Sequence, residues 1–188
     1  MRQLRFDYRD WSFTIDPRNL VFVDEAGVNL AMTRLRGRAP KGERVHDTTP
    51  RNRGQNVSLL GALSMEGLVA TMSVPGSVNT DVFVTYLSEV LIPQLWIGAI
   101  VVMDNLPVHH AAVVARLIEA AGAKLVFLPP YSPDLSPIEL CWSKLKAALR
   151  SAKARTPQAL QQALKQIVTE EISESNAIAW FARCGLFT

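Results

Sequence analysis

The 188-residue sequence lacks the features that mark membrane-spanning, secreted or metal-stapled small proteins. Its longest apolar run, residues 95–103, contains Gly98 and is too short to cross a bilayer. The opening string MRQLRFDYRDW carries scattered charges and no apolar core, so we expect no signal peptide. The only cysteines, Cys141 and Cys184, have no metal-binding or redox spacing. We expect a cytoplasmic protein with two free thiols, and a single disulfide is the alternative.

The composition is that of an ordinary globular chain. Apolar residues make up 48% of the sequence and charged residues 20%, which excludes a disordered or fibrous protein. A chain of this length buries about 70% of the surface that its unfolded form exposes, enough for one domain with its own core. The net charge of +3 is small.

The positive charges are unevenly distributed along the chain. The window of residues 34–53 holds seven basic and two acidic residues, so it carries +5 and the remaining residues together carry −2. A second basic cluster, residues 144–155, contains no acid. Two basic segments on an otherwise acidic body favour a polyanion such as DNA as partner, and two solvated polar faces are the alternative. The residues that we predict to bind DNA are Arg34, Arg36, Arg38, Lys41, Arg44, Arg51, Arg53, Lys146 and Arg150.

The order of predicted elements indicates an α/β fold with a mixed sheet. Apolar runs at 20–23 and 100–103 are typical of strands buried on both faces. The runs 57–63 and 68–74 predict a hairpin, and residues 124–128 predict a fifth strand. We expect the first strand to pair with the hairpin on one side and with the 100–103 strand on the other. Helices covering both faces are predicted over residues 80–92, 111–121, 138–154, 158–171 and 176–183.

Two segments are predicted to lack regular structure. Residues 1–19 mix Arg, Asp and aromatics without a clear period, so we interpret them as a lead-in to a single domain over 20–188. Residues 32–55 are basic and aperiodic, which indicates a long loop or an irregular hairpin. Loops of this length are usually functional or disordered.

Asp24 and Asp104 each follow one of the two buried strands. Acids in this place lie at the carboxyl edge of the sheet, where open α/β sheets bind ligands, although an Asp there can also cap a turn. If the strands are neighbours, the two carboxylates are close together, which is unfavourable unless a cation or a proton intervenes. We therefore favour a divalent-cation site.

Glu139 is the third candidate carboxylate, and a capping box formed with Ser136 is the alternative explanation for it. On the predicted helix, Glu139 shares a stripe with Lys146 and Arg150. Trp142 shares the apolar stripe, so we expect it in the core rather than as a platform for base stacking. An acid that holds a metal, followed by cations that hold phosphates, suits a site that cuts nucleic acid.

Three strings resemble the motifs of DDE transposases: VFVDEAG, VVMDNLPVHH and LPPYSPDLSPIELCW. The chain is similar to the bacterial insertion-sequence-630 branch of the mariner superfamily, whose spacing of 34 residues recurs between Asp104 and Glu139. The basic stretch MTRLRGRAPKGERV is similar as well. The resemblance covers residue 20 to the C-terminus and implies a ribonuclease-H-like fold. It implies catalytic and metal-binding roles for Asp24, Asp104 and Glu139, two Mg²⁺ or Mn²⁺ ions, and accessory roles for Asn105 and His109.

The resemblance implies metal-dependent DNA cleavage and strand transfer in DNA transposition, the activity of an endonuclease and polynucleotidyl transferase. Two ions about 3.5–4 Å apart would hold the attacking and leaving oxygens. The expected partners are transposon-end DNA, target DNA and a second copy in a homodimer, with no membrane. Intact relatives begin with helix-turn-helix modules that this sequence lacks. We therefore expect a truncated copy, or one half of a split reading frame with a separate helix-turn-helix half as partner.

Several alternatives stay open at this stage. The chain could be another ribonuclease-H-like nuclease that cuts without strand transfer, or a non-catalytic remnant that binds DNA. His109 could approach a phosphate or cap the following helix, and Tyr131 could contact DNA or pack its own turn. Glu25 is expected to point away from Asp24, because successive residues of a strand face opposite sides.

Overall fold

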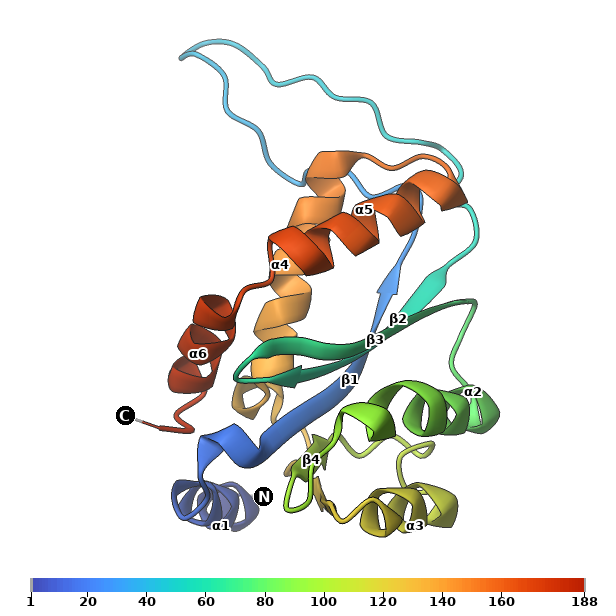
Figure 1. The fold of residues 1–188 in the computed structure, drawn as a ribbon. Helices are drawn as coiled ribbons and strands as arrows, with labels where there is room; N and C mark the ends of the chain where they lie inside the picture. The colour runs from blue at the N-terminus through green and yellow to red at the C-terminus, as the bar shows by residue number, and fades with distance from the viewer. Residues whose placement is uncertain (1, 188) are drawn as a thin grey trace.

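The structure is a computed structural model that describes residues 2–187. One sheet of five strands, in the order β3-β2-β1-β4-β5, carries helices on both faces (Figure 1). The strands are β1 (Leu20–Val28), β2 (Val57–Ser64), β3 (Gly67–Pro75), β4 (Ile100–Met103) and β5 (Lys124–Phe127). The helices are α1 (Arg2–Phe13), α2 (Thr80–Tyr86), α3 (Ala112–Ala120), α4 (Pro137–Ala152), α5 (Pro157–Glu170) and α6 (Glu174–Arg183). The predicted α/β architecture is confirmed.

The central strand β1 pairs in two directions. It runs antiparallel to β2 and parallel to β4, as predicted, and β2 and β3 form the predicted hairpin. The parallel pairing ends at Val23 opposite Met103, whereas the antiparallel pairing continues to Val28 opposite Val57. The strand is therefore longer than the predicted run 20–23 and continues through Asp24, because β2 still pairs with β1 where β4 has ended.

Alternate residues of β1 enter two separate cores. Leu20 and Phe22 belong to the core under α4, α5 and α6, which also receives Tyr8 from α1. Val21 and Val23 belong to the core under α2 and α3. The helical cover predicted for both faces is confirmed. No helix within residues 2–187 has the length and apolar character needed to span a bilayer.

The segment preceding the sheet differs from its prediction, because residues 2–13 form the helix α1 rather than an irregular lead-in. Tyr8 is buried, and Trp11 packs against the same core. Arg5 holds the helix to the Pro-rich turn before α4 by two hydrogen bonds to Asp134, at 2.9 and 2.6 Å. The spacing of Tyr8, Trp11 and Ile15 is helical, but charged residues between them obscure the pattern.

The segment between β1 and β2 is an irregular loop, as predicted, and it extends away from the body of the molecule (Figure 1). After β3, α2 begins at Thr80, the first residue of the predicted helix 80–92, and Asn79 is its N-cap. A π-helical turn (Leu87–Leu91) and a short 3₁₀ helix (Ile92–Gln94) then continue the helical segment to Gln94.

Tyr8 tests whether α1 is part of the core. Its hydroxyl is buried without a hydrogen-bond partner among the described residues, and an unpaired buried hydroxyl costs about 1–3 kcal/mol. Tyr8→Phe should therefore raise the free energy of unfolding by about 1 kcal/mol. Tyr8→Ala should lower it by about 3–5 kcal/mol, because it leaves a cavity.

Urea unfolding followed by circular dichroism measures these effects. The control is Phe6→Ala on the exposed side of the same helix, which should change stability by less than about 0.5 kcal/mol. Equal stabilities for all three variants would show that α1 contributes nothing to the core.

Candidate active site

The three predicted acids line one cavity of about 380 Å³. Asp24 comes from the middle of β1, Asp104 directly follows β4, and Glu139 lies in the first turn of α4. The turn between β5 and α4, residues 128–136, forms most of the remaining wall. Asp24 and Asp104 are 80 positions apart in the sequence, and Asp104 and Glu139 are 35 apart. The sheet and α4 bring these three side chains together.

The strand register explains why the two aspartates meet. Val23 and Met103 form the last parallel pair, so Asp24 and Asp104 occupy the next position on neighbouring strands. Helix α4 covers this side of the sheet through its buried residues and brings Glu139 to the same cavity. The meeting of the three acids is therefore a property of the fold.

Asp24 carries the largest electrostatic cost in the cavity. Burial, together with the negative charges of Glu139 and Asp104, raises the pKa of Asp24 to about 7. Hydrogen bonds from the Glu25 backbone and the Trp142 indole act to lower this pKa. No Lys or Arg is among the residues lining the cavity. A cation in the cavity would offset this charge and keep Asp24 ionised.

Asp104 is instead held in its ionised form. Burial works to raise its pKa, but hydrogen bonds from His109 and from the Leu106 backbone outweigh burial and bring the pKa below its usual value. His109 Nδ1 lies 2.7 Å from Asp104 Oδ1, and its ring packs against Phe83. His109 is 1% exposed, and the N-cap of the following helix is Ala111, with no side-chain hydrogen bond, so the prediction that His109 caps this helix is wrong.

Two neighbouring polar residues have different functions in the fold. Asn105 Nδ2 donates a hydrogen bond to the Leu128 carbonyl at 2.6 Å, which joins the end of β4 to the end of β5. Glu25 points to the other face of the sheet, as predicted. His109 lies near it there and acts to lower the pKa of the Glu25 carboxyl. Burial nevertheless raises the pKa of Glu25, and its Oε2 has no hydrogen-bond partner among residues 2–187.

The capping-box interpretation of Glu139 is wrong. Ser136 is the N-cap residue of α4, but its side chain makes no capping hydrogen bond. Glu139 is exposed and its side chain lines the cavity instead. Tyr131 is 89% exposed on the cavity wall, with φ of 53°, so it does not pack its own turn.

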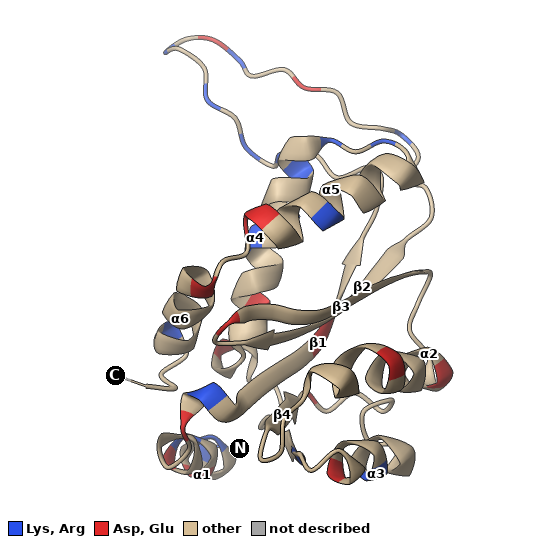
Figure 2. Cartoon of the chain, in the orientation of Figure 1, with Lys and Arg blue, Asp and Glu red and all other residues tan. Residues whose placement is uncertain are grey.

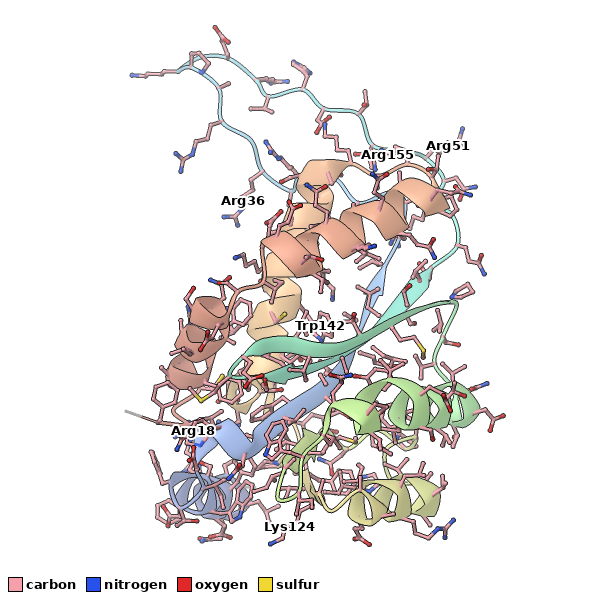
Figure 3. The ribbon with its side chains drawn as sticks, in the orientation of Figure 1. Arg18, Arg36, Arg51, Lys124, Trp142 and Arg155 are labelled. Carbon is pink, nitrogen blue, oxygen red and sulfur yellow. The ribbon has the colours of Figure 1, made fainter. Side chains whose placement is uncertain are left out.

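Sequence reasoning missed the second function of Trp142. It is buried in the core, as predicted, but its Nε1 also donates a hydrogen bond to Asp24 Oδ2 at 3.0 Å. Figure 3 shows Trp142 between α4 and the sheet. A signal was present in β2, where Gly61 interrupts an apolar strand, because a glycine in a strand often marks the close approach of another group.

The donor set suits a hard divalent cation. The cavity offers carboxylate oxygens and no sulfur, which is typical of Mg²⁺ or Mn²⁺ sites. Within residues 2–187 no three His, Cys, Asp or Glu side chains are arranged to hold one ion together. Asp24 lies close enough to both other acids for their charges to raise its pKa.

The predicted DNA-binding residues fall into two groups. Arg51, Arg53, Lys146 and Arg150 line one open hollow at the end of β1. Arg34, Arg36 and Arg38 line a second hollow farther along the loop, and Lys41 and Arg44 are exposed on its outer part. Figure 2 shows these cations on the loop and on the part of α4 nearest to it. Lys146 and Arg150 lie about 10 and 17 Å along the helix axis from Glu139, at 1.5 Å per residue.

Other cations of the second basic cluster hold the base of the loop. Lys153 forms an ion pair with Asp47 at 2.6 Å. Arg155 Nη1 donates to the carbonyls of Leu30 and Met32, at 2.7 and 2.9 Å. Figure 3 places Arg155 at this base, with Arg36 and Arg51 on separate arms of the loop. The loop is therefore joined to the end of α4.

Comparisons with known proteins agree with this geometry. A family profile described as DDE superfamily endonuclease matches residues 19–161. No curated protein matches the chain by sequence. The Mos1 transposase paired-end complex with left transposon end has a TM-score of 0.77 and 19% identity, over 98% of this chain and 60% of that chain. The Mos1 transposase catalytic domain, solved with Raltegravir and Mn, has a TM-score of 0.63 and 17% identity, over 98% and 92%.

Identities this low show the fold alone, which is the predicted ribonuclease-H-like fold. The chain spans about 60% of the length of the Mos1 transposase chain in its paired-end complex. The family profile covers well over half of the present chain. The chain therefore belongs to the DDE superfamily endonucleases and has the fold of a DDE transposase catalytic domain.

Proposed function

We propose that this chain cleaves DNA and joins the cut ends to target DNA in DNA transposition, as the catalytic domain of a mariner-superfamily transposase of the insertion-sequence-630 type. The observation that carries the proposal is the cavity in which Asp24, Asp104 and Glu139 meet without a counter-charge. Mos1 transposase, which shares the fold, is known in a paired-end complex and in a strand transfer complex.

The catalytic chemistry depends on divalent cations, Mg²⁺ or Mn²⁺. When bound, two such ions would polarise the attacking and leaving oxygens of a phosphodiester. Asp24 would contact both ions, while Asp104 and Glu139 would each complete one site. The coupling of Asp24 to both other acids supports this division. Mos1 paired-end complexes solved with Mg and with Mn support the choice of these two metals.

The surrounding residues orient the acids. His109 and the Leu106 backbone donate hydrogen bonds to Asp104, so its carboxylate is ionised and fixed. Asn105 holds the end of β4 against the end of β5. These contacts give accessory roles to Asn105 and His109 that require no contact with DNA.

The cations beyond the cavity would bind the phosphates of a DNA duplex. Lys146 and Arg150 lie on the helix that carries Glu139, and Arg51 and Arg53 face them across the hollow. Lys and Arg bound to phosphates fix the position of a duplex but read no bases. Recognition of a transposon end would then require a helix-turn-helix module in addition to this catalytic domain, and a second copy of the chain would complete a homodimer in the cytoplasm.

The first test removes each acid in turn. Asp24→Asn, Asp104→Asn and Glu139→Gln should each reduce Mg²⁺-dependent nicking of supercoiled plasmid to background, because each removes an anionic ligand. Glu66→Gln, in the exposed hairpin turn, is the matched control and should retain activity. Circular dichroism should show intact folds.

The products distinguish this proposal from its alternatives. Joined products from a DNA end that carries a free 3′-hydroxyl indicate a transposase. Cleavage without joining would indicate another nuclease of this fold, and DNA binding without cleavage would indicate a remnant. Nicking by Glu139→Gln at the rate of the unmodified chain would remove that residue from the site.

The second test concerns the pH dependence of stability in EDTA. The pKa of Asp24 rises from 3.8 in the unfolded chain to about 7 in the folded chain, so the folded state binds the proton more tightly. The free energy of unfolding should therefore fall as pH rises through this window. Between pH 5 and pH 8 the fall should be roughly 2–3 kcal/mol, at about 1.4 kcal/mol per pKa unit.

Asp24→Asn should lack this fall, and the exposed Asp10→Asn should keep it. Urea midpoints at the two pH values provide the measurement. Added Mg²⁺ should stabilise the unmodified chain at pH 8, since it binds only the folded state. An identical pH profile in Asp24→Asn would show that Asp24 is not the group responsible.

The third test concerns the cations on α4. The logarithm of the affinity for duplex DNA should fall with the logarithm of salt concentration by about 0.9 per phosphate neutralised. The double variant Lys146→Ala/Arg150→Ala should flatten this slope by up to about 1.8. Fluorescence anisotropy across a salt series measures the slope.

The control variant Arg116→Ala/Lys124→Ala removes the same net charge from positions away from the loop and α4. Lys124 lies at the end of the molecule opposite the loop (Figure 3). Its slope should match that of the unmodified chain. Equal slopes for both double variants would mean that DNA does not follow α4.

A further inference from the structure

The carboxylate shared by both proposed metal sites is hydrogen-bonded by a buried tryptophan. Trp142 Nε1 lies 3.0 Å from Asp24 Oδ2, and Trp142 is 3% exposed. Trp142 follows Glu139 by three residues on α4, so both lie on neighbouring positions of one helix surface. The same helix therefore carries one proposed metal ligand and the hydrogen-bond donor to another.

The indole reaches Asp24 across a glycine. Gly61 in β2 is directly opposite Asp24 in the antiparallel register. A Cβ atom at this position would lie 2.5 Å from Cη2 and 3.0 Å from Cζ2 of Trp142, closer than side chains pack. A glycine is therefore required at position 61, because the absence of a side chain leaves room for the indole to lie over the strand.

We propose that Trp142 and Gly61 act together as positioning residues that fix the orientation of the Asp24 carboxylate toward the cavity. The inference rests on the proposed function, because it assigns Asp24 to the metal site. Neither Trp142 nor Gly61 is among the residues that line the cavity. Their effect is transmitted through Asp24, which they hold from the protein side of the cavity.

The chemistry of the donor explains the choice of tryptophan. A carboxylate close to two others is driven to rotate away or take up a proton. A Lys or Arg could hold it, but its positive charge would compete with a divalent cation for the same oxygens. The indole N–H is a neutral donor with no acceptor function, so it orients the carboxylate and leaves its charge available to the metal.

A purely structural role for Trp142 makes a different prediction. Trp142→Phe keeps an aromatic ring in the core and removes the N–H donor. A core residue would change stability and leave metal affinity unaltered. A positioning residue would change metal affinity, and loss of an outer hydrogen bond to a metal ligand typically weakens binding by about 10–100-fold.

The experiment measures Mn²⁺ binding to the folded protein by isothermal titration calorimetry, which requires no catalysis. We expect the dissociation constant to rise by about 10-fold or more in Trp142→Phe. The matched control is Trp180→Phe on α6, whose ring packs against the same core and for which we expect unaltered affinity. Urea unfolding reports the structural effect of each variant separately.

Gly61→Ala provides a second variant that keeps the indole. Its Cβ displaces the ring, so we expect a loss of affinity similar to that in Trp142→Phe. In the Trp142→Phe background the shorter ring leaves room for the added methyl group, so combining it with Gly61→Ala should have little further effect. Such non-additivity indicates that the two residues act as one unit.

The outcomes distinguish failure of the positioning role of Trp142 and Gly61 from failure of the proposed function. Mn²⁺ binding and nicking by the unmodified chain, with equal Mn²⁺ affinity in Trp142→Phe, would overturn this inference alone. Additive losses in the double variant would overturn the joint action of Trp142 and Gly61. Failure of the unmodified chain to bind Mn²⁺ would overturn the proposed function and this inference with it.

Discussion

Repulsion among carboxylates in a single cavity is the constraint on which the rest of this structure depends. Asp24, Asp104 and Glu139 meet there without a lysine or arginine among the lining residues. The protein offsets part of the cost with hydrogen bonds from Trp142 to Asp24 and from His109 to Asp104. Four cations, Arg51, Arg53, Lys146 and Arg150, line a separate hollow at the end of β1 and leave the cavity itself without a counter-charge.

The features that local sequence pattern could predict are those that follow from buried strands. Strands covered on both faces read as continuous apolar runs, so the runs 20–23 and 100–103, and the acids that follow each run, could be predicted. The neighbouring positions of Asp24 and Asp104 followed from placing those strands side by side. Short-range patterns also predicted the hairpin and the amphipathic face of α4. These predictions needed no knowledge of distant contacts.

The features that escaped prediction depend on partners distant in sequence. The end of β1 is set by β2, which pairs as far as Val28. Helix α1 is held by burial of Tyr8 and by the contact of Arg5 with Asp134. Ser136 has the residue type of a helix cap, but its side chain makes no capping hydrogen bond, and the Glu139 side chain lines the cavity. Sequence spacing alone does not distinguish these cases.

The continuation of β1 through Asp24 means that the three acids of the site are held by backbone of different kinds. Asp24 lies within a central strand that is still paired with Gly61 of β2. Asp104 follows the last residue of β4, and Glu139 begins a helix after an irregular Pro-rich turn. The position of Asp24 is therefore set by pairing between strands, whereas that of the Asp104 carboxylate is set by hydrogen bonds from His109 and the Leu106 backbone.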